Sequence, residues 1–247
     1  MKLMVLDGNS IINRSFYGIR PLTTRDGLYT HAVYGFLTTL QRLLDEEKPE
    51  GLCVTFDRRE PTFRHEADAD YKATRHAMPE ALAVQMPVLK QVLDAMDIPR
   101  YELVGFEADD LIGTISRRCE AAGWDCVIVT GDKDSLQLVT EHTKVKLVST
   151  RMGQTTTKDM TPGTFREQYG FDPIHMIDLK ALMGDTSDNI PASPAWAKRR
   201  PWRSCSATAA STRSTAFSPT SRPSPPPSAS CRPARTPRAT ATGWQRS

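Results

Sequence analysis

Residues 2–7 read KLMVLD, a short apolar run that ends in an acid. Two further runs have the same form: residues 51–57 read GLCVTFD, and residues 125–131 read DCVIVTG and lead directly to Asp132. Short apolar runs of this kind are typical of strands that are buried on both faces of a sheet. These three runs decide the fold class, because such strands need a layer of helices on each side.

Segments with helical spacing of apolar residues lie between and after these runs. Helices are predicted at residues 33–44, 79–96, 107–122, 161–169 and 174–183, and a fourth strand at 145–149. Alternating strands and helices predict an α/β fold with a mostly parallel central sheet flanked by helices. In such sheets the functional site lies at the carboxyl ends of the strands.

Composition divides the chain into two parts. The 247 residues have a formal net charge of +3, but all 29 acids lie in residues 1–190. Residues 191–247 contain ten basic residues, no acid, and no Leu, Ile, Val or Met. Without aliphatic side chains a segment cannot offset the entropy lost on ordering. We therefore expect a folded domain over residues 1–191 and a disordered Ala/Ser/Pro/Arg tail over residues 192–247.

Other features exclude several classes of protein. The sequence has no apolar run of about 18 residues, which excludes a membrane-spanning helix. The apolar stretch after Met1 is too short for a signal peptide. The five cysteines include no Cys-x-x-Cys pair, so a disulfide framework or a zinc site is not expected. We expect a cytoplasmic protein that does not associate with membranes.

Acidic residues gather where the predicted strands end and beside the helix starts. One acid at such a position is explained by helix capping or a turn more often than by function. A converging set is different, because two carboxylates about 4 Å apart repel by roughly 4 kcal/mol at an effective dielectric constant near 20 and so need cations. Oxygen ligands favour Mg²⁺ or Mn²⁺, and two such ions suit phosphodiester hydrolysis. The candidate metal ligands are Asp7, Asp57, Glu107, Asp109, Asp110, Asp132, Asp134, Asp185 and Asp188.

Basic residues near the same edge have two interpretations. Residues 58–78 are polar and poorly periodic, which is typical of a solvated surface loop. The functional interpretation is a mobile segment over the site, in which Lys72 and Arg75 hold the scissile phosphate and Tyr71 stacks on a base. Arg14, just after the first strand, is close enough to reach the same edge.

Six motifs occur together and in a fixed order along residues 1–191. They are residues 6–10 (LDGNS), 54–57 (VTFD), 71–75 (YKATR), 105–110 (GFEADD), 130–134 (TGDKD) and 181–191 (ALMGDTSDNIP). This combination resembles the 5′-nuclease domain of bacterial DNA polymerase I, which is related to phage 5′-exonucleases and flap endonucleases. The resemblance implies a PIN-like 5′-nuclease fold and a two-metal 5′→3′ exonuclease and flap endonuclease that acts on branched, nicked or 5′-flap DNA.

The resemblance also implies a role for each candidate residue. The set around the first ion would be Asp7, Asp57, Glu107, Asp109 and Asp110. The set around the second ion would be Asp132, Asp134, Asp185 and Asp188. Tyr71, Lys72 and Arg75 fall on the helical arch of the family, and Arg14 matches an arginine that contacts phosphate. Lys72, Arg75 and Arg14 are thus the expected catalytic and nucleic-acid-binding cations, together with Tyr71 for binding.

Two alternatives remain open at this point. The chain is either an enzyme or a catalytically inactive nucleic-acid-binding fragment, which would bind metal without cleavage. A PIN-type ribonuclease shares the sheet and has fewer acids, but the Asp185 and Asp188 pair and the 58–78 segment argue against it. A haloacid-dehalogenase-like phosphatase is set aside because it needs Asp-x-Asp, whereas Asp7 is followed by Gly8 and Asn9.

The chain departs from the family after Pro191. The family continues GVPGVGEKTA, the start of a helix–three-turn–helix motif that grips duplex phosphates with a K⁺ ion, whereas residues 192–201 read ASPAWAKRRP. A GC-rich coding sequence for the family peptide, read after loss of its first base, encodes ASPAWAKRRP. We expect that a one-base loss replaced the end of the domain, that the K⁺ site is lost, and that structure-specific cleavage is weak or absent.

The frameshift hypothesis predicts the bases of the gene. Resequencing of codons 185–205 is expected to show a GC-rich stretch that encodes the family peptide once a single base is restored. An intact reading frame with unrelated bases after the Pro191 codon would contradict the hypothesis.

Overall fold

The computed structural model describes residues 1–151 and 154–194, and this part of the chain forms a six-stranded sheet in the order β3-β2-β1-β4-β5-β6. The predicted α/β fold with a mostly parallel sheet is confirmed: strands β1 to β5 pair in parallel, and β6 alone runs antiparallel, against β5. The strands are β1 (Lys2–Asp7), β2 (Gly51–Thr55), β3 (Arg100–Tyr101), β4 (Asp125–Thr130), β5 (Thr143–Arg151) and β6 (Gln154–Met160).

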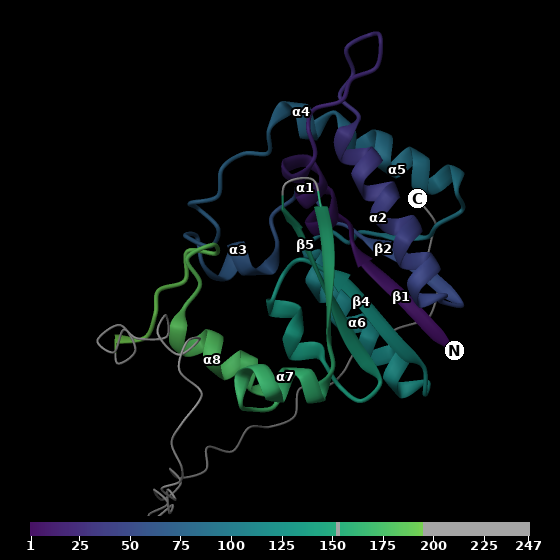
Figure 1. Cartoon of the computed structure of the whole chain (residues 1–247). Helices are drawn as coiled ribbons and strands as arrows, with labels where there is room; N and C mark the ends of the chain where they lie inside the picture. The colour runs from purple at the N-terminus through teal and green to yellow at the C-terminus, as the bar shows by residue number, and fades with distance from the viewer. Residues whose placement is uncertain (152–153, 195–247) are drawn as a thin grey trace, which may run out of the picture. The chain divides into compact units, whose positions relative to one another are not determined.

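Helices cover both faces of this sheet. The α-helices are α1 (Gly8–Gly18), α2 (His31–Glu47), α3 (Phe63–Ala67), α4 (Glu80–Ala83), α5 (Gln85–Ala95), α6 (Ala108–Ala121), α7 (Pro162–Tyr169) and α8 (Met176–Met183), and the 3-10 turns are η1 (Asp134–Leu138) and η2 (Pro173–His175). Helices α1, α2, α4 and α5 share one hydrophobic cluster, and α6, η1, α7 and α8 share the other. Figure 1 shows α2 and α5 together on one side of β1 and β4, with α7 and α8 on the other.

The alternation of side chains along the strands explains the two clusters. Met4 and Leu6 belong to the first cluster, whereas Val5 between them belongs to the second. Successive side chains of a strand point to opposite faces, so a continuous apolar run supplies both cores at once. All three side chains are fully buried.

Several elements differ from the sequence-based expectation. The single helix predicted over residues 79–96 is two helices, α4 and α5, which are interrupted at Val84. Pro87 explains the break, because it has no N–H to donate to the carbonyl of Ala83 and its ring crowds that carbonyl. Strand β6 reads QTTTKDM and has no apolar run. It forms at the edge of the sheet, where polar side chains can face solvent, and for that reason periodicity did not indicate it.

The expectations for the C-terminal tail concern residues that the structure largely does not describe. The proposed disordered, out-of-frame segment 192–247 and the loss of the K⁺ site lie outside the described residues, apart from positions 192–194. Among the described residues, every helix is too short or too polar to cross a membrane.

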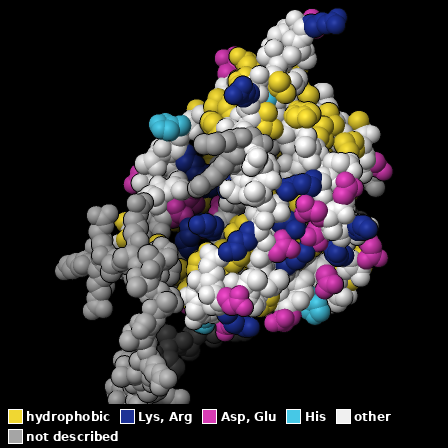
Figure 2. Space-filling view, viewed as in Figure 1, with side chains coloured by type: hydrophobic (Ala, Val, Ile, Leu, Met, Phe, Trp, Pro, Cys, Tyr) yellow, Lys and Arg dark blue, Asp and Glu magenta, His cyan; other side chains and the backbone are white. Residues whose placement is uncertain are grey.

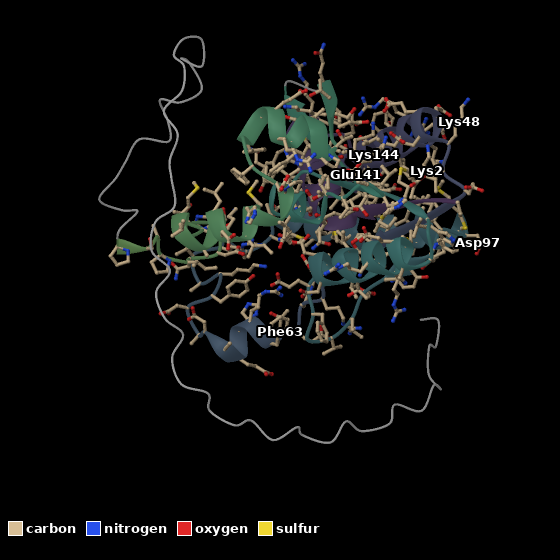
Figure 3. The ribbon with its side chains drawn as sticks, turned by 90° about the horizontal axis from the view of Figure 1, so that it is seen from below. Lys2, Lys48, Phe63, Asp97, Glu141 and Lys144 are labelled. Carbon is tan, nitrogen blue, oxygen red and sulfur yellow. The ribbon has the colours of Figure 1, made fainter. Side chains whose placement is uncertain are left out.

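A cluster of charges ties α2 to the last two strands. Glu47, near the end of α2, is buried and accepts hydrogen bonds or ion pairs from Lys144 at 2.8 Å and from Lys146 at 3.0 Å. Lys146 is also buried and lies 2.7 Å from Asp159 on β6. Basic and acidic side chains alternate on the face seen in Figure 2. Figure 3 shows that this part of the molecule, marked by Lys144 and Lys2, lies well away from α3, which is marked by Phe63.

The pKa values in this cluster favour the charged forms. Burial alone would raise the pKa of Glu47, but the hydrogen bonds from Lys144 and Lys146 outweigh it and hold that pKa below its usual value. Burial likewise opposes ionisation of Asp159, whose pKa is lowered by Lys146 and Lys144. The pKa of Lys146 is raised, because Asp159 and Glu47 outweigh the effect of burial.

The K146M variant is expected to lose about 2–3 kcal/mol of unfolding free energy at pH 7, because buried Glu47 then keeps fewer cationic partners. The loss is expected to shrink as pH falls through the lowered pKa values of Glu47 and Asp159, since protonated acids gain nothing from Lys146. The part contributed by Lys146 is fully present below the ordinary lysine pKa of 10.5 and is lost only as pH rises through the raised pKa of Lys146.

Urea unfolding curves between pH 3 and pH 10 measure this difference. The matched control is K48M, because Lys48 is exposed at the end of α2 and forms no ion pair among the described residues. Equal unfolding free energies for K146M and the wild-type chain at pH 7 would contradict a stabilising role for the cluster.

Candidate metal-dependent active site

A hollow of about 660 Å³ lies at the carboxyl ends of β1, β2 and β4. Eight of the nine predicted metal ligands line it: Asp7, Asp57, Glu107, Asp109, Asp132, Asp134, Asp185 and Asp188. They come from strand ends, from the start of α6 and from the segment after α8. The parallel sheet brings them together because all of its parallel strands end at one edge.

Asp7 joins the ends of the two central strands. It closes β1 and caps α1 by accepting a hydrogen bond from the Ser10 backbone N–H at 2.9 Å. Its other oxygen accepts from the Thr130 hydroxyl at the end of β4, at 2.8 Å. The Gly131 N–H in turn donates to the Ser10 hydroxyl at 2.9 Å. These bonds hold Asp7 at a defined position on the edge.

Asp57 is held in a similar way between β2 and α6. One oxygen accepts from the Asn9 side-chain amide at 2.9 Å, and the other accepts from the backbone N–H of Ala108 at 2.7 Å. Ala108 is the first residue of α6, so Asp57 meets the positive end of that helix. Asn9 therefore connects Asp57 to the segment that begins with Asp7.

Burial and neighbouring carboxylates raise the pKa of Asp7. Burial, together with the negative charges of Asp57 and Asp132, raises the pKa of Asp7 to about 6, although hydrogen bonds from Ser10 and Thr130 oppose the rise. Asp7 is only 6% exposed. A buried carboxylate beside two like charges gains from a nearby cation.

Burial and neighbouring carboxylates also raise the pKa of Asp109. Crowding by the surrounding protein, and then the charges of Asp7, Asp132, Asp57 and Glu107, raise the pKa of Asp109 to about 8. Its residue surface is nevertheless open to solvent inside the hollow, so water screens part of the repulsion. Burial is the largest cause of the raised pKa of both acids, and repulsion by neighbouring carboxylates adds to it.

Residues 70–75 meet the acids from across the hollow. Lys72 Nζ lies 2.7 Å from Glu107 Oε1, and Arg75 Nη2 lies 2.5 Å from Asp188 Oδ1. The backbone N–H of Lys72 also donates to the Asp188 carbonyl at 3.0 Å. The structure thus places both expected phosphate-binding cations at the candidate site, where they are paired with carboxylates.

Tyr71 lies differently from the expectation that it stacks on a base. Its ring is 8% exposed and packs edge-on against His65. Its hydroxyl donates to Glu107 and to Asp188, each at 3.2 Å. In this conformation the ring is covered, and Tyr71 instead links the two acids.

Lys180 is a cation that the sequence analysis missed. Its ammonium lies 2.6 Å from Asp134 and 2.8 Å from Asp185, and these contacts raise its pKa even though burial opposes the charge. It belongs to α8, five residues before Asp185. A lysine on the helix that leads into an acidic motif is the signal that could have identified it.

Asp110 stands apart from the other eight acids. Its two oxygens accept from the two terminal nitrogens of Arg64, at 2.7 and 2.8 Å, and one of them also accepts from the backbone N–H of Glu107 at 3.0 Å. It lines a neighbouring cavity and not the hollow. The structure therefore places Asp110 outside the hollow, where it is paired with Arg64 at the start of α6.

Arg14 lies at the rim and not in the hollow. It projects from α1 and donates through Nη2 to the Gly131 carbonyl. Glycine at position 131 permits this approach, because a Cβ atom there would overlap the Arg14 guanidinium in its present position. The close approach fixes Arg14 beside the end of β4.

The donor set fits a hard divalent cation in its chemistry, because it consists of carboxylate oxygens that repel one another in a polar hollow. As placed, no three His, Cys, Asp or Glu side chains of the described segments are arranged to hold one ion. Lysines and arginines pair with four of the acids instead. Binding of an ion would require these cations to exchange partners.

Comparisons with known proteins identify the family. Residues 2–170 match the family model described as "5'-3' exonuclease, N-terminal resolvase-like domain". The chain is 44% identical over 193 residues to DNA polymerase I of Bacillus subtilis, and 43% identical over 194 residues to DNA polymerase I of Mycobacterium leprae. These alignments cover 78% of this chain and 22% and 21% of the relatives, so the chain spans about a fifth of their length.

Solved structures share the fold. A zinc-bound T5 5′-exonuclease aligns with a TM-score of 0.62 and 23% identity, and a DNA complex of the bacteriophage T5 flap endonuclease aligns with a TM-score of 0.60 and 22% identity. Each alignment covers 78% of this chain and 70% of the T5 chain. The T5 structures share the fold, and the family model and the DNA polymerase I relatives confirm the predicted resemblance: the chain belongs to the 5′-3′ exonuclease family.

Proposed function

We propose that this chain hydrolyses phosphodiester bonds of DNA in a reaction that depends on Mg²⁺ or Mn²⁺. The observation that carries the proposal is the convergence of eight carboxylates on one hollow at the carboxyl edge of a parallel sheet. Structural charges are normally paired or kept apart, whereas this set is crowded enough to raise the pKa of Asp7 and of Asp109. Such crowding suits a site that receives cations.

Two acidic groups would hold the ions. Asp7, Asp57, Glu107 and Asp109 would form one group, and Asp132, Asp134, Asp185 and Asp188 would form the other. When bound, the ions would supply an activated water and would stabilise the leaving oxygen. Asp110 would act through Arg64 and the start of α6, since it lines the neighbouring cavity and not the hollow.

The basic residues would bind the substrate. Lys72 and Arg75 would move from Glu107 and Asp188 to the phosphate that is to be cleaved, because a phosphate offers the same charged oxygens. Arg14 would hold a neighbouring phosphate from the rim. DNA is the proposed substrate because T5 relatives of the same fold include a DNA complex, and a 5′ flap or a nick is the form implied by the family.

Cleavage at branches is expected to be weak in this chain. The residues after Pro191 do not read as the duplex-binding motif of the family, so the chain would lack that grip on the duplex. The ten basic residues of segment 191–247 would supply an attraction to nucleic acid that does not depend on its structure.

The D109N variant tests the proposed chemistry. It is expected to cleave a labelled 5′-flap DNA more than about 100-fold more slowly than the wild-type chain with Mg²⁺ or Mn²⁺, because it removes a ligand that faces the hollow. The D97N control changes an exposed acid far from the hollow, labelled in Figure 3, and is expected to keep the wild-type rate.

The same assay separates the proposal from its alternatives. A wild-type chain that binds metal but cleaves neither DNA nor RNA would be a nucleic-acid-binding fragment. Faster cleavage of RNA than of DNA of equal sequence would indicate a PIN-type ribonuclease. Cleavage of a flap at the rate of an intact family member would contradict the expected weakness at branches.

Divalent ions are also expected to stabilise the fold. An ion that binds only the native state at 100 times its dissociation constant adds about 2.7 kcal/mol, which corresponds to a rise in Tm of roughly 5–10 °C for a domain of this size. Thermal unfolding in Mn²⁺ and in EDTA measures the shift. D7N and D109N should show a smaller shift than D97N, and equal Tm values for the wild-type chain in both conditions would exclude metal binding.

A further inference from the structure

A second groove, of about 300 Å³, lies beside the hollow. It is bounded by α1, by the loop after β4, by the outer strands β5 and β6, and by α7 (Figure 1). Gly131 and Lys133 line both the groove and the hollow. A ligand in the groove would therefore be continuous with one in the hollow.

Three cations face this groove: Arg14, Lys133 and Lys158. None of them forms an ion pair with a carboxylate within the segments that the structure describes. The cations of the hollow differ, because Lys72 and Lys180 each lie within 3 Å of an acid. The groove thus carries positive charge that the described part of the protein does not neutralise.

The groove is built from rigid parts. Strands β5 and β6 are paired along its floor, where Ser149 stands opposite Thr156. Lys158 is held in place by a hydrogen bond to the Gln168 side chain on α7. Arg14 is fixed against Gly131, and its Nε atom is buried without a hydrogen-bond partner.

The chemistry of the lining selects the ligand. Lysine, arginine and hydroxyl groups in one groove are the usual partners of phosphate oxygens. Leu147, Val148 and Tyr169 also line the groove, so its walls are partly apolar and would lie against the sugars of a strand while the cations contact its phosphates. Three cations in one groove suit successive phosphates of a strand better than a single small anion.

We propose that this groove binds the sugar–phosphate backbone of a nucleic-acid strand next to the bond that is cleaved, with Lys158 as its outermost contact. The inference rests on the proposed nuclease function. It extends that function by a binding surface formed by β5, β6 and α7, directly beside the hollow that contains the acids.

The K158E variant tests the groove, because Lys158 is exposed on an edge strand and its replacement leaves the core intact. Binding is measured by fluorescence anisotropy of the full chain with labelled single-stranded and 5′-overhang DNA in EDTA, where hydrolysis cannot occur. K158E is expected to bind roughly five-fold more weakly, whereas K158R keeps wild-type affinity. The slope of log Kd against log salt should fall by about one for K158E.

The matched control is K48E, which makes the same charge change at a lysine between α2 and β2. Lys48 precedes the start of β2 at Gly51, at the amino ends of the parallel strands, whereas the hollow lies at their carboxyl ends. K48E is expected to weaken binding less than K158E and to leave the salt slope closer to that of the wild-type chain. Equal losses for K48E and K158E would overturn the groove and leave the nuclease proposal standing if the wild-type chain still cleaves DNA. A wild-type chain that neither binds nor cleaves DNA would overturn both.

Discussion

Repulsion among carboxylates is the constraint on which the functional edge of this protein depends. Two carboxylates about 4 Å apart repel by roughly 4 kcal/mol at an effective dielectric constant near 20, and eight of them share one hollow. The protein offsets this repulsion with three kinds of group. Backbone N–H groups of Ser10 and Ala108 and the Thr130 hydroxyl bind the acids at the strand ends. Lysines and arginines pair with those farther out.

The scaffold makes this crowding possible because it is rigid where the acids are attached. The two central strands, β1 and β4, are buried on both faces and are tied together at their carboxyl ends by Asp7, Thr130 and Ser10. Gly8 continues the chain directly from Asp7 and leaves room for the Phe56 ring, which a Cβ atom would displace. Close packing behind the site therefore keeps the acids at fixed positions, and the stability of the cores offsets the cost.

Cations are distributed unevenly around this edge. On the side of residues 70–75 and α8, Lys72, Arg75 and Lys180 are paired with acids, so a bound ion or phosphate must compete with existing contacts. On the side of β5, β6 and α7, Lys133 and Lys158 have no such competitor among the described residues. A substrate strand would meet unpaired charge first on that side. The groups that would attract a negatively charged strand are therefore different from the acids that would hold metal ions in the hollow.

The sequence by itself determined the three buried strands, the alternation with helices and the set of acids at the strand ends. These features are local: a short apolar run forms a strand buried on both faces, and parallel strands end at one edge. The edge strands β3 and β6 and the division of residues 79–96 at Val84 were not predicted, because they depend on neighbouring chain segments and on the effect of Pro87.

Only the tertiary structure decided which partners each acid has. Lys72 and Glu107 are 35 residues apart, and Arg75 and Asp188 are 113 residues apart. No local pattern encodes these pairings, because they arise when folding brings distant segments to one edge. The same reason explains why Asp110 is held by Arg64, why Tyr71 is covered, and why Lys158 lies beside Arg14 in a groove that the sequence did not indicate.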